Sequence, residues 1–383
     1  MNYTEIFNEI DRLNGKYIEF WKDVCDIESP TMDKEGVDAV GRYFEERAAA
    51  LGWSVERFSQ PVSGDVLTFT MNSESDAAPV ILSGHIDTVH PKGLFGYPPT
   101  RIEGDKIYGP GVADCKGGTV AAFLAMEALK NVGFTARPVS LMLQVDEEGG
   151  SKASGKATIN YMCERAQGAV AFLNLEPAKK GVACIERKGI ITFKFTVTGA
   201  EAHSSLCAVA GANAICEAAY KIIELEKLKD DDGLTCNIGV IDGGSVPNTV
   251  AGKCEFLANV RFATAEQLEW VKEYAQRVAD TVHIKGCSCT VEVYGSRLAM
   301  ERSERNIQLL DRMNGIFTEC GLSTLEGVRS RGGSDAAEMT CAGVPCVDSL
   351  GVEGGTYHSV NEYAVVSSLA EYAKRMAAVV LKI

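Results

Sequence analysis

The side chains best suited to chemistry in this chain are imidazoles and carboxylates that stand at the ends of short apolar stretches. The stretch VILSG leads directly into His85, with Asp87 two residues later. The stretch LMLQV ends in three consecutive acids, 146–148, and AFLNL ends in Glu176. If these stretches are neighbouring strands of a parallel sheet, their carboxyl ends meet at one edge, which is where open α/β sheets place their sites.

Two further segments carry residues of the same kind. Asp114 stands in the glycine-rich segment YGPGVADCKGG, and His358 stands in the late segment GGTYHS. Each residue alone is a weak signal, because a histidine after a strand is most often an ordinary hydrogen-bonded residue. Carboxylates gathered at one sheet edge, however, repel one another unless a cation neutralises them. Imidazole and carboxylate ligands suit zinc, and two metals in a hydrolase lie about 3.5–4 Å apart and share a bridging carboxylate.

The surrounding sequence predicts the elements that would position these residues. From Pro79 to about Pro177, continuous apolar strands alternate with helical segments such as GGTVAAFLAMEALKNVG. This order is typical of an α/β sheet covered by helices on both faces. The N-terminal segment MNYTEIFNEIDRLNGKYIEF is amphipathic and predicts the first helix of the fold.

The pattern changes near Lys188. The segment GIITFKFTVTG alternates with period two, as a strand with one solvated face does, and the segments after it predict the β-α-β-β-α-β order of a ferredoxin-like unit. After about Leu298 the α/β character returns. We therefore expect a catalytic domain in two parts, residues 1–187 and 298–383, interrupted by an inserted α+β lid at residues 188–297.

Composition narrows the partners and the compartment. The formal net charge of −14 disfavours nucleic acid as a partner, since phosphate binding requires a basic surface. No stretch approaches the roughly 20 apolar residues of a membrane span. The 13 cysteines are odd in number and scattered, so we expect reduced thiols that act as small apolar residues. The acidic N-terminal segment lacks the features of a secretory signal, and together these observations favour the cytoplasm.

The ordered motifs resemble those of a known family. HIDTV, GPGVADCKGG, DEE, the EP after a strand and the late histidine are similar to motifs of the zinc aminoacylase and carboxypeptidase metallopeptidases, which include acetylornithine deacetylase and succinyl-diaminopimelate desuccinylase. The segments EGDKIYGPGVAD, RKGI, GGSDAA and GTYHS look closest to the glutamate carboxypeptidases of the carboxypeptidase G type. The resemblance runs from about residue 10 to the C-terminus. It implies a zinc-peptidase-like catalytic domain with a mixed, mainly parallel sheet, and a ferredoxin-like domain that serves as lid and dimerisation domain.

The resemblance also implies a metal-binding role for five residues. His85 and Glu176 would hold one zinc ion, and Glu148 and His358 would hold the other. Asp114 would bridge the two ions. The alternative metals are Co²⁺ and Mn²⁺.

Neighbours of these ligands would complete the catalytic machinery. By resemblance, Asp87 would accept a hydrogen bond from the His85 imidazole and fix its tautomer. Glu147 would be the general base: it would take a proton from the metal-bound water, whose hydroxide attacks an amide carbonyl, and pass that proton to the leaving amine. Asp146 is expected to be structural, because alternating side chains at a strand end cannot all face one metal. Cys115, directly after the bridging residue, is not expected to be a ligand.

The expected lid supplies a second group of residues by resemblance. His203, in TGAEAHSS, matches a histidine that reaches the active site of the partner subunit and stabilises the oxyanion. Asn248, in GGSVPNTV, matches an asparagine that contacts the substrate or the oxyanion. Arg261 matches an arginine that grips the substrate carboxylate, a task that suits a planar guanidinium. Arg297 is a further candidate for the same anion pocket.

The segment GGSDAA resembles the glycine-rich loop that lies beside the substrate in this family. It makes Gly333 and Ser334 candidate substrate-binding residues, because backbone N–H groups of such a loop can bind a carboxylate. The preceding Arg331 stands where the carboxypeptidase G pattern usually has glycine. The side-chain preference of the pocket therefore stays open.

Several functions remain open at this point. We expect a two-zinc hydrolase that cleaves an amide bond next to a free carboxylate, in the manner of a glutamate carboxypeptidase, on a small peptide or N-acyl amino acid. An N-acyl amino acid deacylase or a di- or tripeptidase would share the metal site and differ in the pocket. A non-catalytic binding protein on the same fold is disfavoured by the presence of Glu147 and every expected ligand, and a one-metal site is a further alternative. The role of His203 predicts a homodimer that forms through the lid.

Overall fold

The computed structural model describes residues 2–230 and 233–383, which fold into two compact units. One unit comprises Met1–Ile185, Arg302–Arg329 and Ser334–Ile383. The other comprises Glu186–Glu301 and Ser330–Gly333. The segment expected to form the lid, residues 188–297, lies within the second unit.

Strands and helices alternate along the first unit. The strands of its main sheet are β1 (Ser54–Phe58), β2 (Val66–Met71), β3 (Val80–His85), β6 (Val139–Gln144), β7 (Ala171–Asn174) and β14 (Cys346–Val347). The helices are α1 (Tyr3–Asp26), α2 (Lys34–Ala50), α3 (Lys116–Asn131), α4 (Ala157–Arg165), α7 (Glu304–Glu319), α8 (Ala336–Cys341) and α9 (Ser368–Lys382). Short strands form two smaller sheets, one of β4 (Arg101–Glu103), β5 (Lys106–Tyr108), β15 (Gly354–Gly355) and β16 (Tyr363–Val365), the other of β8 (Val182–Arg187) and β13 (Glu326–Ser330).

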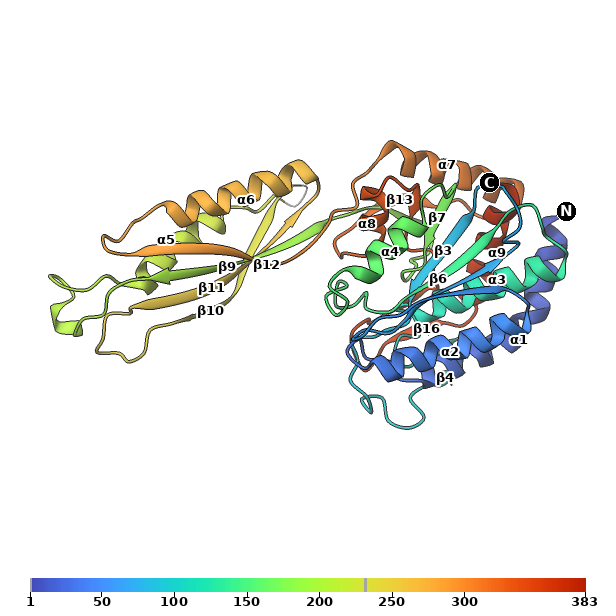
Figure 1. Cartoon of the computed structure of the whole chain (residues 1–383), viewed down its shortest axis with the longest axis horizontal. Helices are drawn as coiled ribbons and strands as arrows, with labels where there is room; N and C mark the ends of the chain where they lie inside the picture. The colour runs from blue at the N-terminus through green and yellow to red at the C-terminus, as the bar shows by residue number, and fades with distance from the viewer. Residues whose placement is uncertain (1, 231–232) are drawn as a thin grey trace. The chain divides into compact units, whose positions relative to one another are not determined.

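The main sheet has the strand order β1-β2-β6-β3-β7-β14, and Figure 1 labels its central strands β6, β3 and β7. The strands β6, β3, β7 and β14 run parallel to one another. At one side of the sheet, β2 runs antiparallel to both of its neighbours, β6 and β1. Every residue of β3 and β6 is buried, as expected for central strands covered on both faces. The predicted fold class, α/β with a mixed, mainly parallel sheet, is confirmed.

Helix α1 begins as the amphipathic pattern of the N-terminal segment predicts. The side chain of Asn2 accepts a hydrogen bond from the backbone N–H of Thr4 (3.0 Å) and caps the helix. The buried residues Ile6, Ile10 and Tyr17 recur at helical spacing. This apolar face packs against α3 and α9, so it belongs to the core that supports the sheet.

The second unit is a four-stranded antiparallel sheet with two helices. Its elements are β9 (Gly189–Thr198), a short 3₁₀ turn (Ser204–Leu206), α5 (Ala214–Leu225), β10 (Thr235–Gly243), β11 (Lys253–Phe262), α6 (Ala265–Asp280) and β12 (Ser288–Arg297). The strand order is β10-β11-β9-β12, and all neighbours are antiparallel. The predicted β-α-β-β-α-β order is therefore found. Phe193, Phe195 and Phe256 point from the sheet into a core shared with both helices.

The buried side chain of Lys221, on α5, links the two helices of this second unit. The Lys221 ammonium donates hydrogen bonds to the carbonyls of Val278 and Thr281 at the end of α6, 2.9 and 2.7 Å away. It also lies 2.9 Å from the Glu217 carboxylate, and both side chains are 1% exposed. The ammonium group donates to carbonyls that have no intrahelical partner at the helix end. Its positive charge is stabilised by the negative end of the helix dipole.

The composition also led to expectations about membrane spans and cysteines. Within residues 2–230 and 233–383, no helix is both long and apolar enough to cross a membrane. The thirteen cysteines are free thiols, and most of them are buried, as expected of side chains that act as small apolar residues.

Candidate metal centre

The centre forms where three adjacent parallel strands end. β3 lies between β6 and β7, and it ends in His85. The acids 146–148 follow β6 by two residues or more, and Glu176 follows β7 after Leu175. Because parallel neighbours end at the same edge, side chains from segments almost 100 residues apart in sequence are brought together there.

The Asp114 carboxylate lies between the two predicted imidazole ligands. Its Oδ1 atom is 3.0 Å from Nε2 of His85, and its Oδ2 atom is 3.4 Å from Nε2 of His358. Glu176 Oε1 lies 3.8 Å from the His85 nitrogen, and Glu148 Oε2 lies 3.3 Å from the His358 nitrogen. The structure thus brings the five predicted ligands into two half-sites that share one carboxylate.

The ring of His85 is held from behind by Asp87. Nδ1 of the imidazole lies 2.9 Å from the backbone carbonyl oxygen of Asp87 and 3.4 Å from its carboxylate. The shorter contact makes the carbonyl the main acceptor. With Nδ1 facing this carbonyl, Nε2 faces Asp114, and in the neutral ring it would offer its lone pair to a metal.

The Asp87 carboxylate also binds the backbone of residues 146–148, which form the acidic turn. It is fully buried, and it accepts hydrogen bonds from the backbone N–H groups of Glu147 and Glu148, each 3.2 Å away. The hydroxyl of Thr31 donates a third bond at 2.7 Å. These bonds fix the turn that carries Glu147 and Glu148 relative to the strand end that carries His85.

Imidazoles and carboxylates in the centre shift one another's pKa values. Hydrogen bonds to Asp114 and Glu148 raise the pKa of His358 to about 10. Burial raises the pKa of Glu148, against the hydrogen bond from His358. Burial also acts to raise the pKa of Asp114, but hydrogen bonds from His358 and His85 outweigh it and hold that pKa below its usual range. Carboxylates this close repel one another unless positive charge neutralises them, and protonated imidazoles or a bound cation can supply that charge.

Helix α3 approaches the end of β7 closely, which explains the KGG motif after Asp114. A Cβ atom added at Gly118 would lie 2.4 Å from the carbonyl oxygen of Leu175. One added at Gly117 would lie 2.3 Å from the carbonyl oxygen of Val112. Both distances are too short for any side chain. Gly118 therefore lets the helix start pack against the strand end that leads to Glu176, and Gly117 lets it lie close to the backbone of the Asp114 segment.

The donor set fits a metal centre. Ligand atoms of His85, Asp114 and Glu148 lie within 4.8 Å of one another, and so do those of His85, Cys115 and Glu176. The Cys115 thiol, however, accepts the backbone N–H of His85 at 3.1 Å, and burial raises its pKa to about 12. A neutral thiol is a poor metal ligand. The remaining imidazole and carboxylate donors are those of hydrolytic rather than structural zinc sites.

Asp146, the first of the three acids, has a structural role, as expected from alternation. Its carboxylate accepts hydrogen bonds from the Thr158 hydroxyl at 2.6 Å and from the backbone N–H of Ser154 at 2.9 Å. It therefore ties the acidic turn to the start of α4.

Comparison with known proteins agrees with this geometry. Residues 81–382 match the model of peptidase family M20/M25/M40. The chain belongs to this M20 family. The resemblance drawn from the motifs is thereby confirmed, and because M20 enzymes are metal-dependent hydrolases, the chain is a metallopeptidase or amidohydrolase.

Individual relatives span nearly the whole chain. It is 29% identical over 353 residues to carboxypeptidase G2 of Pseudomonas sp. (strain RS-16), covering 90% of this chain and 84% of that protein. Its fold matches the aminopeptidase PepT of Bacillus cereus ATCC 10987 with a TM-score of 0.78 at 22% identity, covering 96% and 98% of the two chains. It also matches the YXEP protein of Bacillus subtilis, described as a dinuclear metal binding peptidase, with a TM-score of 0.70 at 15% identity, covering 97% and 98%.

Two of the residues predicted from M20 motifs meet in the second unit. The backbone N–H of Ser204, next to His203, donates to the carbonyl of Asn248 at 2.9 Å. His203 is exposed, and its Nδ1 accepts the backbone N–H of Ser205 at 3.3 Å. The proton of the neutral ring therefore lies on Nε2, where it is available to a negatively charged oxygen.

The predicted anion-binding residues of the second unit gather around its 330–333 segment. The Arg261 guanidinium donates to the carbonyl of Arg331 at 3.3 Å, and burial lowers its pKa. A Cβ atom added at Gly333 would lie 2.9 Å from Cδ of Arg297, so these two residues pack together. The hydroxyl of Ser334, in the first unit, donates instead to the buried carboxylate of Asp348 at 2.6 Å.

Two residues to which the motifs assign no role lie beside the centre. Glu362 and His90 are buried, and the Glu362 carboxylate accepts the backbone N–H of Asp114. Neither stands in a motif that signals chemistry. The available signal was the position of Glu362, four residues after His358, which becomes informative once the fold is known.

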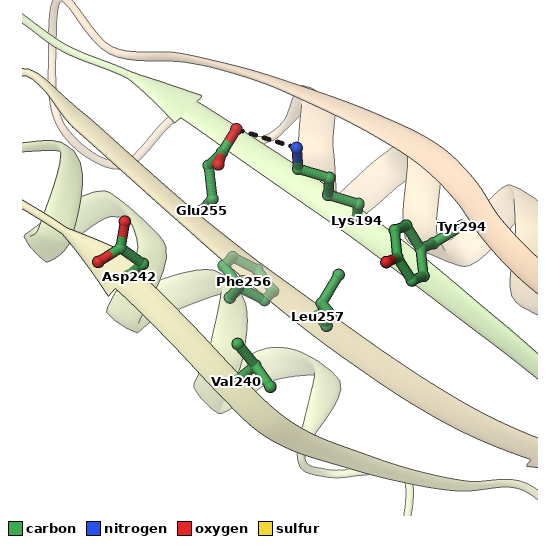
Figure 2. Close-up of a pocket in the computed structure, with 7 residues that line it drawn as sticks. All are labelled: Lys194, Val240, Asp242, Glu255, Phe256, Leu257 and Tyr294. Atoms are coloured by element: carbon green, nitrogen blue, oxygen red, sulfur yellow. Dashed lines mark ion pairs between the residues drawn. The ribbon is translucent and has the colours of Figure 1, made fainter. Parts of the chain in front are cut away.

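A hollow on the sheet of the second unit contains none of the predicted site residues (Figure 2). It is lined by Lys194, Val240, Asp242, Glu255, Phe256, Leu257 and Tyr294. The Lys194 ammonium pairs with Glu255 at 3.2 Å. The lining provides no imidazole to hold a metal or to transfer a proton near neutral pH.

Proposed function

We propose that this M20 protein is a two-zinc carboxypeptidase that releases a C-terminal amino acid, with glutamate as the leading candidate, from a small peptide or an N-acyl amino acid. The observation that carries the proposal is the Asp114 carboxylate, which offers one oxygen to each of two half-sites. The 29% identity to carboxypeptidase G2 supports the choice of reaction. Co²⁺ or Mn²⁺ would be accepted by the same donors.

The metal ligands in this proposal are the five residues of the two half-sites. His85 and Glu176 would hold one zinc ion, Glu148 and His358 the other, and Asp114 both. Bound there, zinc supplies Lewis acidity that lowers the pKa of water and polarises a carbonyl.

Glu147 is the proposed general base. It directly precedes a ligand, and its backbone N–H is fixed by Asp87 at 3.2 Å, so its position relative to the metals is constrained. Its carboxylate would take the proton of the attacking water and return it to the leaving amine. Placement by a rigid turn matters, because proton transfer needs the two heavy atoms within hydrogen-bonding distance.

Residues of the second unit would bind the rest of the substrate. The Arg261 guanidinium is half-buried, and desolvation lowers its pKa. A partly desolvated cation is stabilised when an anionic group binds beside it. We propose that it grips the free carboxylate, with Arg297 and Gly333 beside it. His203, through Nε2–H, and Asn248 would stabilise the oxyanion.

We further propose a homodimer that forms through the second unit. β10 is an outer strand of its sheet, and α5 packs on that strand. Apolar side chains remain exposed on both elements: Val240 at 56%, Ile241 at 54% and Ile223 at 63%. Apolar groups gathered at a sheet edge are typical of protein interfaces. The free thiols support a reducing compartment, and we propose the cytoplasm.

The substitution Glu147→Ala tests the mechanism. We expect the variant to retain its metals while hydrolysis falls by at least ~10²-fold, the low end for loss of a general acid–base catalyst. Elemental analysis gives the metal content, with two zinc ions per chain expected, and initial rates give the activity. Unchanged turnover would remove Glu147 from the mechanism, and one zinc ion per chain would remove the two-metal site.

A substrate panel tests the specificity. Zinc-loaded enzyme is incubated with N-acyl amino acids, dipeptides and tripeptides that differ in the C-terminal residue, and each with its C-terminal amide as a matched control. We expect release of C-terminal glutamate and little cleavage of the amides, because Arg261 would lose its anionic partner. Equal cleavage of acid and amide would contradict a carboxypeptidase.

A further inference from the structure

One buried carboxylate outside the predicted ligand set is bonded to the backbone of the bridging residue. Glu362 is 1% exposed, and its Oε1 atom accepts the backbone N–H groups of both Ala113 and Asp114, each at 3.1 Å. Its Oε2 atom lies 2.8 Å from Nε2 of His90, which is 5% exposed. Both carboxylate oxygens are thus used, one for the metal-binding turn and one for a histidine ring.

The backbone of Glu362 also forms hydrogen bonds with the segments that carry His358 and Asp114. Its N–H donates to the carbonyl of Ser359 at 3.0 Å, next to His358, and its carbonyl accepts the N–H of Gly109 at 3.3 Å. His90 itself lies five residues after His85. One residue therefore connects three stretches of chain, and each of these stretches carries one of the predicted ligands.

Two consecutive N–H groups bound to one oxygen restrict the peptide planes on either side of Ala113, and the second of these planes leads into Asp114. The orientation of those planes sets the direction of the Asp114 side chain, whose two oxygens face His85 and His358 at 3.0 and 3.4 Å. A modest rotation of this backbone would aim both oxygens at one half-site. Residues behind the ligands that fix their orientation commonly tune a metal site.

We propose that Glu362 is a positioning residue for the metal centre: it holds the Asp114 backbone so that the carboxylate serves both half-sites, and His90 holds Glu362. The inference rests on the proposed function, because it requires Asp114 to be a metal ligand. The Phe95 ring packs edge-on against His90, with centroids 4.9 Å apart, and so fixes the imidazole in its turn.

A matched control exists elsewhere in the chain. Glu217, also 1% exposed, accepts two consecutive backbone N–H groups, those of His283 and Ile284, at 2.9 and 2.6 Å. Its other oxygen lies 2.9 Å from the Lys221 ammonium. It makes the same kind of bonds as Glu362, but in the unit that holds none of the proposed metal ligands. Loss of either carboxylate should lower stability, but only the loss of Glu362 should change metal binding.

The experiment compares metal binding by Glu362→Ala, Glu362→Gln and Glu217→Ala with that of the parent protein. Each apoprotein is titrated with Zn²⁺ against a competing chelator, and the visible absorption spectrum of its Co²⁺ form is recorded, because that spectrum reports ligand geometry. We expect Glu362→Ala to bind the metals about 10–100-fold more weakly, with an altered Co²⁺ spectrum. Glu217→Ala should unfold at a lower temperature and yet show the parent affinities and spectrum.

The conservative variant separates positioning from general damage. The amide oxygen of Glu362→Gln can still accept the two N–H groups and its amide nitrogen can donate to the His90 ring, so we expect it to restore most of the metal affinity and the parent spectrum. If Glu362→Ala does not fold, His90→Leu replaces it, since that variant removes the ring partner of Glu362; a shifted Co²⁺ spectrum is again expected.

The outcomes separate this inference from the proposed function. A folded Glu362→Ala, or in its place His90→Leu, with parent affinities and an unchanged Co²⁺ spectrum would overturn the positioning role, while the two-metal proposal would stand. A parent protein that fails to bind two metal ions would overturn the proposed function itself. A Glu217→Ala variant that also loses metal would show that the effect is general destabilisation, and would overturn the inference too.

Discussion

At the scale of single residues, Asp87 shows how a side chain that touches no proposed substrate can organise the centre. Its carbonyl holds the imidazole of His85, and its carboxylate holds the two peptide N–H groups of the acidic turn. The orientation of the proposed ligand His85 and the position of the proposed base Glu147 therefore both depend on Asp87. Groups of this kind are expected to matter nearly as much as the ligands themselves.

The substitution Asp87→Asn should separate these tasks. The carbonyl that holds His85 remains, but one carboxylate oxygen becomes an NH₂ group that faces a backbone N–H donor. We expect kcat to fall about 10–100-fold with the fold retained, because the turn that carries Glu147 loses an acceptor. Steady-state kinetics and circular dichroism measure the two effects. Thr31→Val, which removes the third donor to the same carboxylate, is the milder control, and a parent-like Asp87→Asn would contradict the role.

The motifs point to the proposed ligands, but not to the residues that form hydrogen bonds with them. His85, Glu148 and Glu176 follow apolar strands, and a strand end is visible in sequence. Glu362 and His90 have no such signal, since their importance comes from hydrogen bonds to chain segments far away in sequence. The Ser334 hydroxyl likewise has a partner that its motif does not reveal, the Asp348 carboxylate. The substrate contact that the motif suggests stays a prediction.

At the scale of elements, hydrophobic period predicted the central parallel strands of the main sheet and the strands of the second unit, but not β1 and β2. Continuous apolar runs predicted β3, β6 and β7, and the alternation of GIITFKFTVTG predicted β9, in which every second residue is buried. The small sheet of β4, β5, β15 and β16 was not predicted. Its strands are two or three residues long, and their pairing joins segments more than 240 residues apart, so no local pattern records it.

The buried pair between Glu217 and Lys221 makes the stability of the second unit depend on pH. Burial acts to raise the pKa of Glu217, but the hydrogen bonds from Lys221 and from two backbone N–H groups outweigh it, and the pKa is lowered. A lowered carboxyl pKa stabilises the fold at pH values above that of an unfolded glutamate, about 4.3, and the contribution is lost as pH falls through the folded-state value.

Glu217→Gln should therefore flatten the acid side of the stability profile. At pH 7 it leaves the Lys221 ammonium buried without its anion, which costs about 3–5 kcal/mol. As pH falls through the lowered folded-state pKa of Glu217, the parent protein also loses the charge, so the difference between the two should shrink. Urea unfolding of both proteins at several pH values measures it. Glu269→Gln, which breaks an exposed pair with Lys272, should change little, and a Glu217→Gln difference independent of pH would contradict the assignment.

At the scale of the whole molecule, the proposed chemistry draws on both units. The metal ligands and Glu147 lie in the first, whereas His203, Asn248 and Arg261 lie in the second. By its resemblance to M20 enzymes, the chain is expected to contribute His203 to the site of a second copy. In a symmetric dimer each site would then combine the metals of one subunit with the histidine of the other.

Mixing two inactive variants tests that arrangement. In a heterodimer of Glu147→Ala with His203→Ala, one site combines both substitutions, but the other combines an intact Glu147 with an intact His203. If His203 acts across the interface, heterodimers purified with two different tags should recover about half of the parent activity per dimer, because one of two symmetric sites is restored. Each homodimer should stay inactive. If His203 acts within its own chain, each site keeps one defect, and the purified heterodimer should be as inactive as its parents.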